Sequence, residues 1–137
     1  MAVKTFLKKS ELQQEKMEWG ASTFINDPQS TGAQQIVTIK ATFKSRKGHD
    51  FHLHPRQEEV IYVLAGTLEQ WVGEEREILM QGDAAFIPAG QVHASFNTGA
   101  EDVKILAILS PAVGAEGYEV EEVSHREPWN KLREGRS

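Results

Sequence analysis

The amino-acid sequence predicts an all-β protein in which short strands form a sandwich or barrel. Strand-like runs recur at intervals of about ten residues through the middle of the chain, with turn residues between them. The first clear run, Gln35 to Phe43, is rich in β-branched side chains, which pack well in strands. Helix is expected only in short pieces near the two ends.

The remaining strands can be justified in order along the chain. Asp50 to His54 is extended and partly apolar, and Val60 to Leu64 is apolar throughout, which indicates a strand buried on both faces. Turn residues at Gly73, Gly82 and Gly90 separate the later runs. Those later runs are residues 67–72, 77–80, 84–87, 91–97 and 103–109.

The length of 137 residues predicts one domain, 1–137. It divides into an N-terminal segment (1–33), a barrel core (34–111) and a C-terminal tail (112–137). In the first segment, Ser10 to Gln13 has the pattern of a capping box that opens a short helix, although an extended segment remains an alternative. In the tail, Pro128 to Leu132 is expected to form one helical turn that covers a sheet edge or a partner surface.

The composition is that of an ordinary globular protein, with 39% hydrophobic and 26% charged residues. The net charge of −5 argues against a nucleic-acid partner, because no basic excess is present to neutralise phosphates. No apolar run is long enough for a membrane span, and no signal peptide is recognisable, so a cytoplasmic protein is expected. The chain has no cysteine, which excludes disulfides and thiolate metal sites.

Three histidines and one glutamate have spacings that suit a shared metal ion: His52, His54, Glu59 and His93. His52 and His54 stand two apart in an extended run, where alternate side chains share a face. Imidazole and carboxylate groups are ligands for divalent Fe, Mn, Ni, Cu or Zn. The sequence therefore predicts a divalent metal site with open positions for a small-molecule ligand.

The spacing continues beyond these residues. Six residues separate Glu59 from Gly66. Further along the chain, Gly82 is followed by Pro88, Gly90, His93 and Asn97, and three residues separate the last two. This arrangement resembles the two motifs of the cupin superfamily, in particular a small single-domain cupin with a conserved barrel of the cupin 2 type. The resemblance covers residues 40–109 closely. Only Arg46 departs from it, because the family usually has glycine there for a turn.

The resemblance implies a double-stranded β-helix, or jelly-roll barrel, whose metal ligands project between two sheets. In this interpretation His52, His54 and Glu59 come from neighbouring strands and His93 from a facing one. Glu59 is also a candidate catalytic base. The strand parity places Ser95 on the inward face beside His93, and the candidates for an apolar pocket wall are Phe43, Ile61, Val63, Phe86 and Ala107. Of these, Phe43, Ile61 and Ala107 are predicted, with Ser95, to bind the substrate.

Other polar and aromatic residues are given structural roles. His49 and His125 are expected at the surface or in ordinary hydrogen bonds, and Asn97 is expected to close a turn. Trp19 and Trp71 are expected in the core or an interface rather than in a pocket.

Cupins include dioxygenases, isomerases, cyclases and non-catalytic binding proteins, so the fold does not decide the activity. The first hypothesis is a metal-dependent enzyme, dioxygenase-, isomerase- or cyclase-like, that acts on a small oxygen-bearing organic substrate. The alternative is a non-catalytic binding or sensor cupin with a structural metal. A homodimer is also expected, with Val60, Tyr62, Leu64 and Trp129 at its contact surface.

Overall fold

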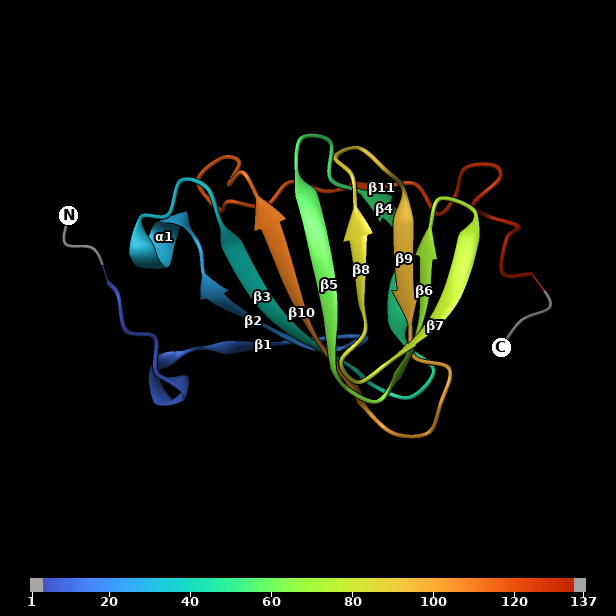
Figure 1. Cartoon of the computed structure of the whole chain (residues 1–137), viewed down its shortest axis with the longest axis horizontal. Coiled ribbons are helices and arrows are strands. Elements are labelled where there is room, and N and C mark those ends of the chain that lie inside the picture. The colour runs from blue at the N-terminus through green and yellow to red at the C-terminus, as the bar shows by residue number, and fades with distance from the viewer. Residues whose placement is uncertain (1–3, 135–137) are drawn as a thin grey trace.

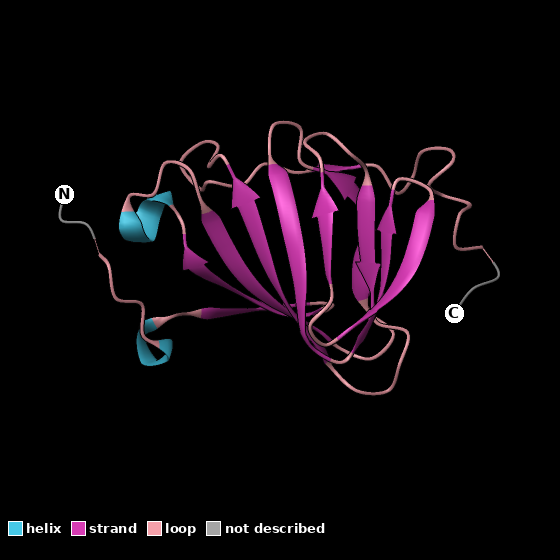
Figure 2. Ribbon diagram, viewed as in Figure 1, coloured by secondary structure: helices cyan, strands magenta, loops and turns pink. Residues whose placement is uncertain are grey.

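A computed structural model describes residues 4–134 of the chain. Its strands run in two antiparallel sheets with very little helix (Figures 1 and 2). The predicted all-β jelly-roll fold is therefore confirmed. The helical pieces are η1 (Lys9–Glu11) and α1 (Pro28–Thr31), and the strands are β1 (Gln14–Met17), β2 (Gly20–Asn26), β3 (Val37–Phe43), β4 (Gly48–Leu53), β5 (Glu58–Ala65), β6 (Thr67–Val72), β7 (Glu75–Met80), β8 (Ala84–Ile87), β9 (His93–Phe96), β10 (Val103–Ser110) and β11 (Glu121–Glu122).

Within the described residues, one sheet has the strand order β1-β2-β3-β10-β5-β8 and the other has the order β11-β4-β9-β6-β7. Side chains from β3, β5 and β10 alternate between buried and more exposed positions, as expected for strands with one face on a core. The core between the sheets includes Phe43, Ile61, Val63, Leu68 and Ile105. Figure 1 shows the two sheets facing each other and diverging toward the top of the view.

Strand β5 departs from the expectation of burial on both faces. Glu59, Ile61 and Val63 are buried, but Tyr62 on the other face is 40% exposed. A continuous apolar run predicts a strand covered on both faces, but the sequence does not reveal whether a second layer is present to cover it. In the described chain no element covers that face.

The terminal segments contain more order than the sequence indicates. Strands β1 and β2, which were not predicted, extend the six-stranded sheet beyond β3. The expected capping box at Ser10 is not formed, because the short helix Lys9–Glu11 has no side-chain cap. A capping box occurs instead at α1, where Asp27 and Ser30 bond each other's backbone amides.

The helical turn expected at Pro128 to Leu132 is a series of turns, and this part of the C-terminal tail packs on its own sheet. Trp129 and Leu132 lie against an apolar cluster on the outer face of the five-stranded sheet, and the Trp129 ring is 5.5 Å from the Phe51 ring. Arg133 reaches the buried Glu69 with an Nε–Oε2 distance of 2.8 Å and stacks over Phe96. The tail was expected to cover a sheet edge or a partner surface, and Trp129 and Leu132 instead cover a sheet face of their own chain.

The turn before β4 confirms the steric demand that the resemblance implies. Arg46, at the usual glycine position, has a φ of 67°, and among the described residues it is the non-glycine residue with positive φ. A side chain in this region is strained by contact between Cβ and the backbone. Among the described residues, no helix is long and apolar enough to cross a membrane. The cytoplasmic location stays a prediction.

Candidate metal centre

The four predicted ligand residues come together between the two sheets. His52 on β4 is the direct register partner of His93 on β9 in the five-stranded sheet, and His54 follows in the turn after β4. Glu59 reaches the same place from β5 in the opposite sheet. The expectation that His93 faces the other three was therefore wrong, because Glu59 is the residue from the facing sheet. Pairing between distant segments decides this, and local spacing does not encode it.

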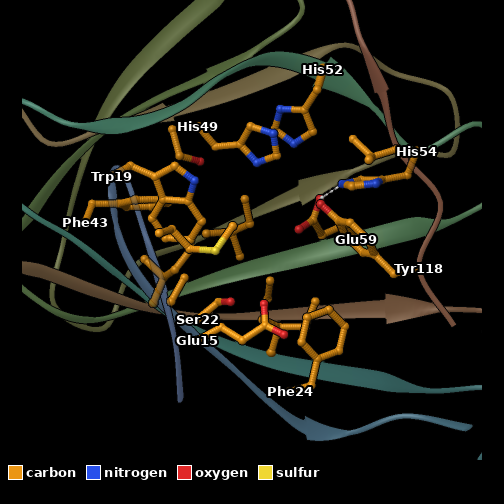
Figure 3. Close-up of a pocket in the computed structure, with 18 of the residues that line it drawn as sticks. Glu15, Trp19, Ser22, Phe24, Phe43, His49, His52, His54, Glu59 and Tyr118 are labelled. Carbon is orange, nitrogen blue, oxygen red and sulfur yellow. Dashed lines mark ion pairs between the residues drawn. The ribbon is translucent and has the colours of Figure 1, made fainter. Parts of the chain in front are cut away.

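The four side chains are buried and lie close together. His52, His54, Glu59 and His93 are 4%, 2%, 5% and 0% exposed. One ring nitrogen from each of the three histidines lies within 4.8 Å of the others, an arrangement that can hold a metal ion. The Oε1 atom of Glu59 lies 3.2 Å from His54 Nε2 and 2.9 Å from His93 Nε2. Figure 3 shows His52, His54 and Glu59 around one end of a pocket.

Backbone carbonyls determine which nitrogen of each of the three imidazoles carries the proton and which one keeps a lone pair for a metal ion. The Nδ1 atoms of the three histidines lie 2.6, 2.8 and 3.0 Å from the carbonyl oxygens of Asp50, Glu119 and Gln91. A carbonyl only accepts hydrogen bonds, so each Nδ1 carries the proton and each neutral ring keeps its lone pair on Nε2. This is the outer hydrogen bond that usually orients a metal-binding histidine.

Two buried atoms at the centre lack a suitable partner. Among the described residues, neither Glu59 Oε1 nor His93 Nε2 forms a hydrogen bond of acceptable geometry, although the two atoms are close. Buried polar atoms are costly to leave unpaired, and two facing acceptors repel each other. A divalent cation among the Nε2 atoms and the carboxylate would satisfy both. The donor set thus fits a first-row transition ion.

Burial and mutual contact alter the acidity of these groups. Burial, with repulsion from His49 and His93, lowers the pKa of His52 well below its usual value. Burial also opposes ionisation of Glu59, but the adjacent imidazoles of His54 and His93 favour the carboxylate anion more strongly, above all when they are protonated, and lower the Glu59 pKa to about 2. Burial lowers the pKa of His54, yet the Glu59 carboxylate reverses this and raises it overall. Glu59 is therefore ionised and His52 neutral at ordinary pH.

A second histidine pair lies beside the centre. His49 stacks on His52 with ring centroids 3.5 Å apart, and its Nε2 lies 3.0 Å from Glu122 Oε2. His49, His52 and Glu122 also form a group with metal-compatible distances. The sequence predicts no role for His49 at the site, because a single histidine outside the spaced motifs is more often a surface or hydrogen-bonded residue. Residues three apart on a regular strand also point to opposite faces. A register shift between His49 and His52 brings both rings to one side.

A cavity of about 310 Å³ opens from the metal centre into the space between the sheets (Figure 3). The four predicted substrate-binding residues, Phe43, Ile61, Ser95 and Ala107, all line it. Their role in binding stays a prediction. Ser95 donates to Gln70 Oε1 over 2.6 Å, which fixes its hydroxyl.

Other assignments of the cavity wall need correction. The prediction that Phe86 lines the pocket was wrong, because Phe86 lies on the outer face of its sheet and is 57% exposed. Val63 is in the core and does not line the cavity. Trp19 packs against the core cluster, as expected, but it also lines the cavity, where it tilts against Phe43 at 5.2 Å. Tyr118, which sequence analysis did not single out, lines it beside His54.

The remaining predicted roles agree with the structure. Asn97 donates to the carbonyls of Phe43 and Glu101 and accepts from the Gly99 amide, so it closes the turn after β9. Trp71 is in the core cluster with Phe51.

Comparison with known families decides the classification. The family model described as "Cupin domain" matches residues 40–109, about half of the chain. The chain belongs to the cupin family. Germin-like protein 2-1 of Oryza sativa subsp. japonica is 38% identical to this cupin over an alignment 68 residues long, which covers 43% of this chain and 31% of that protein. The matched region thus spans about a third of the length of that relative.

Solved structures with the same fold include enzymes. The polyketide cyclase RemF from Streptomyces resistomycificus has a TM-score of 0.72 and 20% identity, over 93% of this cupin and 91% of that chain. Lactobacillus farciminis oxalate decarboxylase, in a formate complex, has a TM-score of 0.74 and 20% identity, over 85% of this cupin and 35% of that chain. At these identities the likeness shows the fold alone. An enzyme is plausible, and the particular activity has to come from the site.

Proposed function

We propose that this cupin is a metal-dependent enzyme that acts on a small oxygen-bearing organic substrate. The supporting observation is the group of ring nitrogens of His52, His54 and His93, with the unpartnered Oε1 atom of Glu59 close to those of His54 and His93. We expect these four residues to hold one divalent ion of Fe, Mn, Ni, Zn or Cu. Dioxygenase, isomerase and cyclase reactions all remain compatible with such a site.

The cavity has the candidate metal centre at one end and an apolar wall beyond it, and this arrangement supports the proposal. When bound, the ion would supply Lewis-acid polarisation of a substrate oxygen, or redox chemistry with oxygen if it is redox-active. Phe43, Ile61 and Ala107 offer an apolar wall that would orient the substrate and exclude water. The Ser95 hydroxyl offers a fixed polar contact close to the metal end.

Glu59 has two candidate roles. As a ligand it would neutralise part of the charge of the ion. As a catalytic base it would accept a proton from the substrate, but a carboxylate with a pKa of about 2 is a weak base. The ligand role therefore has the stronger support, and the catalytic role requires that its contacts with His54 and His93 be weakened.

The experiment is to load metal-free protein with Fe(II), Mn(II) or Ni(II) and to screen catechols, flavonols and β-diketones for turnover. Glu59→Gln should abolish turnover because it removes the charged ligand at almost constant size. The neighbouring Glu58→Gln is the matched control, since Glu58 is exposed on the other face of β5, and it should retain turnover. Selective ligand binding without any metal-dependent conversion would instead favour the non-catalytic binding cupin.

We also propose that the outer face of the six-stranded sheet forms a homodimer contact. On neighbouring strands, Tyr62 pairs in register with Leu106, and Val60 with Ile108 and Phe86. This apolar face is open in the described chain, with Phe86 57% exposed. Of the predicted contact residues, Trp129 packs on its own chain instead. Sedimentation of Tyr62→Glu against the parent should show loss of a dimer; a monomeric parent would contradict the proposal.

A further inference from the structure

The charge distribution around the cavity distinguishes one class of ligand from another. The lining residues include Glu15, Glu59 and Glu122, and no lysine or arginine is among the described residues that line the cavity. Glu122 pairs with His49 over 3.0 Å. Glu15 is exposed on the edge strand β1, and its side chain lies across the cavity from the histidines (Figure 3). Negative charge is therefore present at both ends of the cavity.

The wall between those ends is apolar and partly aromatic. Trp19 and Phe43 are tilted by 56° with ring centroids 5.2 Å apart, and Phe24 lies next to Tyr118. Small side chains at Ala41 and Ala107 leave room between the sheets. This wall suits a flat, uncharged organic body, which gains from burial of apolar surface and from contact with aromatic rings.

The charge balance limits how many negative charges a ligand can bring. Glu59 would cancel one of the two positive charges of a bound divalent ion, so one positive charge would remain at that end. A ligand with two carboxylates would bring two negative charges to an end that keeps one positive charge. One negative charge would stay uncompensated, with Glu122 close to that end and Glu15 across the cavity. Like charges brought together in this way reduce affinity.

Building on the proposed metal site, we propose that this cavity selects neutral or singly charged chelators with a flat apolar body and rejects dicarboxylates. Glu15 acts as a specificity-determining residue: it touches no metal ligand but sets the charge at the far end of the cavity. The fold-sharing oxalate decarboxylase makes the dicarboxylate class the relevant comparison.

Calorimetric titration of zinc-loaded protein with catechol and with phthalate tests this inference without requiring turnover. The two probes share one ring and differ in carrying neighbouring hydroxyl groups or neighbouring carboxylates. Catechol should bind at least about tenfold more tightly than phthalate. Added salt screens the charges, so it should reduce this difference in affinity. Oxalate should resemble phthalate. Equal affinities, or tighter binding of phthalate, would overturn the inference.

A charge-reversal pair isolates Glu15 from the net charge of the protein. Glu15→Lys should raise phthalate affinity and leave catechol affinity nearly unchanged. Glu75→Lys makes the same charge change on β7, at an exposed position outside the cavity, and should leave the ratio unaltered. An equal change of the affinity ratio in Glu15→Lys and Glu75→Lys would show that Glu15 does not determine the specificity.

The outcomes separate this inference from the proposed enzyme. Selective binding of catechol by zinc-loaded protein, with no turnover in the metal screen, would support the charge selection and count against the enzyme. Zinc binding without preference for catechol would keep the metal site and overturn the selection. Failure to bind both zinc and catechol would reject both.

Discussion

His52 and His93 stand directly opposite each other on antiparallel strands β4 and β9, with ring centroids 4.2 Å apart. Opposed side chains on such strands are close enough to share a ligand. Their Nδ1 atoms are both held by backbone carbonyls two residues earlier, at Asp50 and Gln91. The sheet therefore presents two preoriented Nε2 atoms before any ion arrives, and His54 and Glu59 complete the group.

Replacement of His93 by alanine should abolish stoichiometric metal binding. The parent should gain about 2.7 kcal/mol of unfolding free energy at a metal concentration a hundredfold above its dissociation constant. The variant should show no such gain, because one of three preoriented nitrogens is missing. His125→Ala, outside the metal group, is the control and should behave as the parent. Elemental analysis and thermal unfolding with and without metal measure this; a metal-dependent gain in His93→Ala would contradict the site.

The metal-free protein should lose stability in acid through Glu59. The pKa of Glu59 is about 2 in the folded protein and about 4.5 unfolded, so its contribution is present above pH 4.5 and is lost as the pH falls toward 2. The difference corresponds to about 3 kcal/mol. Denaturant unfolding across this range should show a shallower pH dependence for Glu59→Gln than for the parent or for Glu58→Gln. Identical slopes in all three proteins would be inconsistent with the lowered pKa.

Arg46→Gly should stabilise the protein, which is unusual for a glycine substitution. Arg46 has a φ of 67°, where a Cβ atom is strained, and glycine removes that strain at the cost of a more flexible unfolded chain. A net gain of about 0.5–1 kcal/mol is expected. Arg46→Ala keeps the Cβ and should show no gain. Urea unfolding measures the stability of both variants. Equal stabilities of Arg46→Gly and Arg46→Ala would show that strain at positive φ is not the cause of any gain.

Arg133→Met should destabilise the attachment of the C-terminal tail. The substitution removes a charged hydrogen-bond donor from Glu69, which is only 3% exposed. In the variant Glu69 would keep its hydrogen bond from Trp71 and its 3.8 Å contact with Arg76. Loss of a hydrogen bond to a buried charged group costs about 1.5–3 kcal/mol.

The control for Arg133→Met is Arg126→Met, which breaks the exposed pair with Glu121. That change should cost less than about 1 kcal/mol. Chemical unfolding compares the two variants. A cost for Arg133→Met no larger than that for Arg126→Met would show that the tail is not held by Glu69.

The residues proposed as metal ligands could be selected from the sequence because their spacings are encoded locally. The spacing of His52 and His54 follows the two-residue period of a strand, and the spacing around Glu59 and His93 follows motifs that do not depend on the rest of the chain. The same holds for the inward parity of Ser95 and for the turn at Asn97. Short-range backbone geometry determines all of these, and short-range geometry can be read directly from residue order.

Only the tertiary structure decided which segments meet. It placed His93 beside His52 and Glu59 across from them, and it brought His49 onto the same face through an irregularity in the strand. It added β1, whose polar sequence carries no strand alternation, and so placed Glu15 in the cavity wall. These features depend on backbone pairing between distant segments. Such pairing follows from the free energy of the whole packed barrel, which no local pattern of side chains contains.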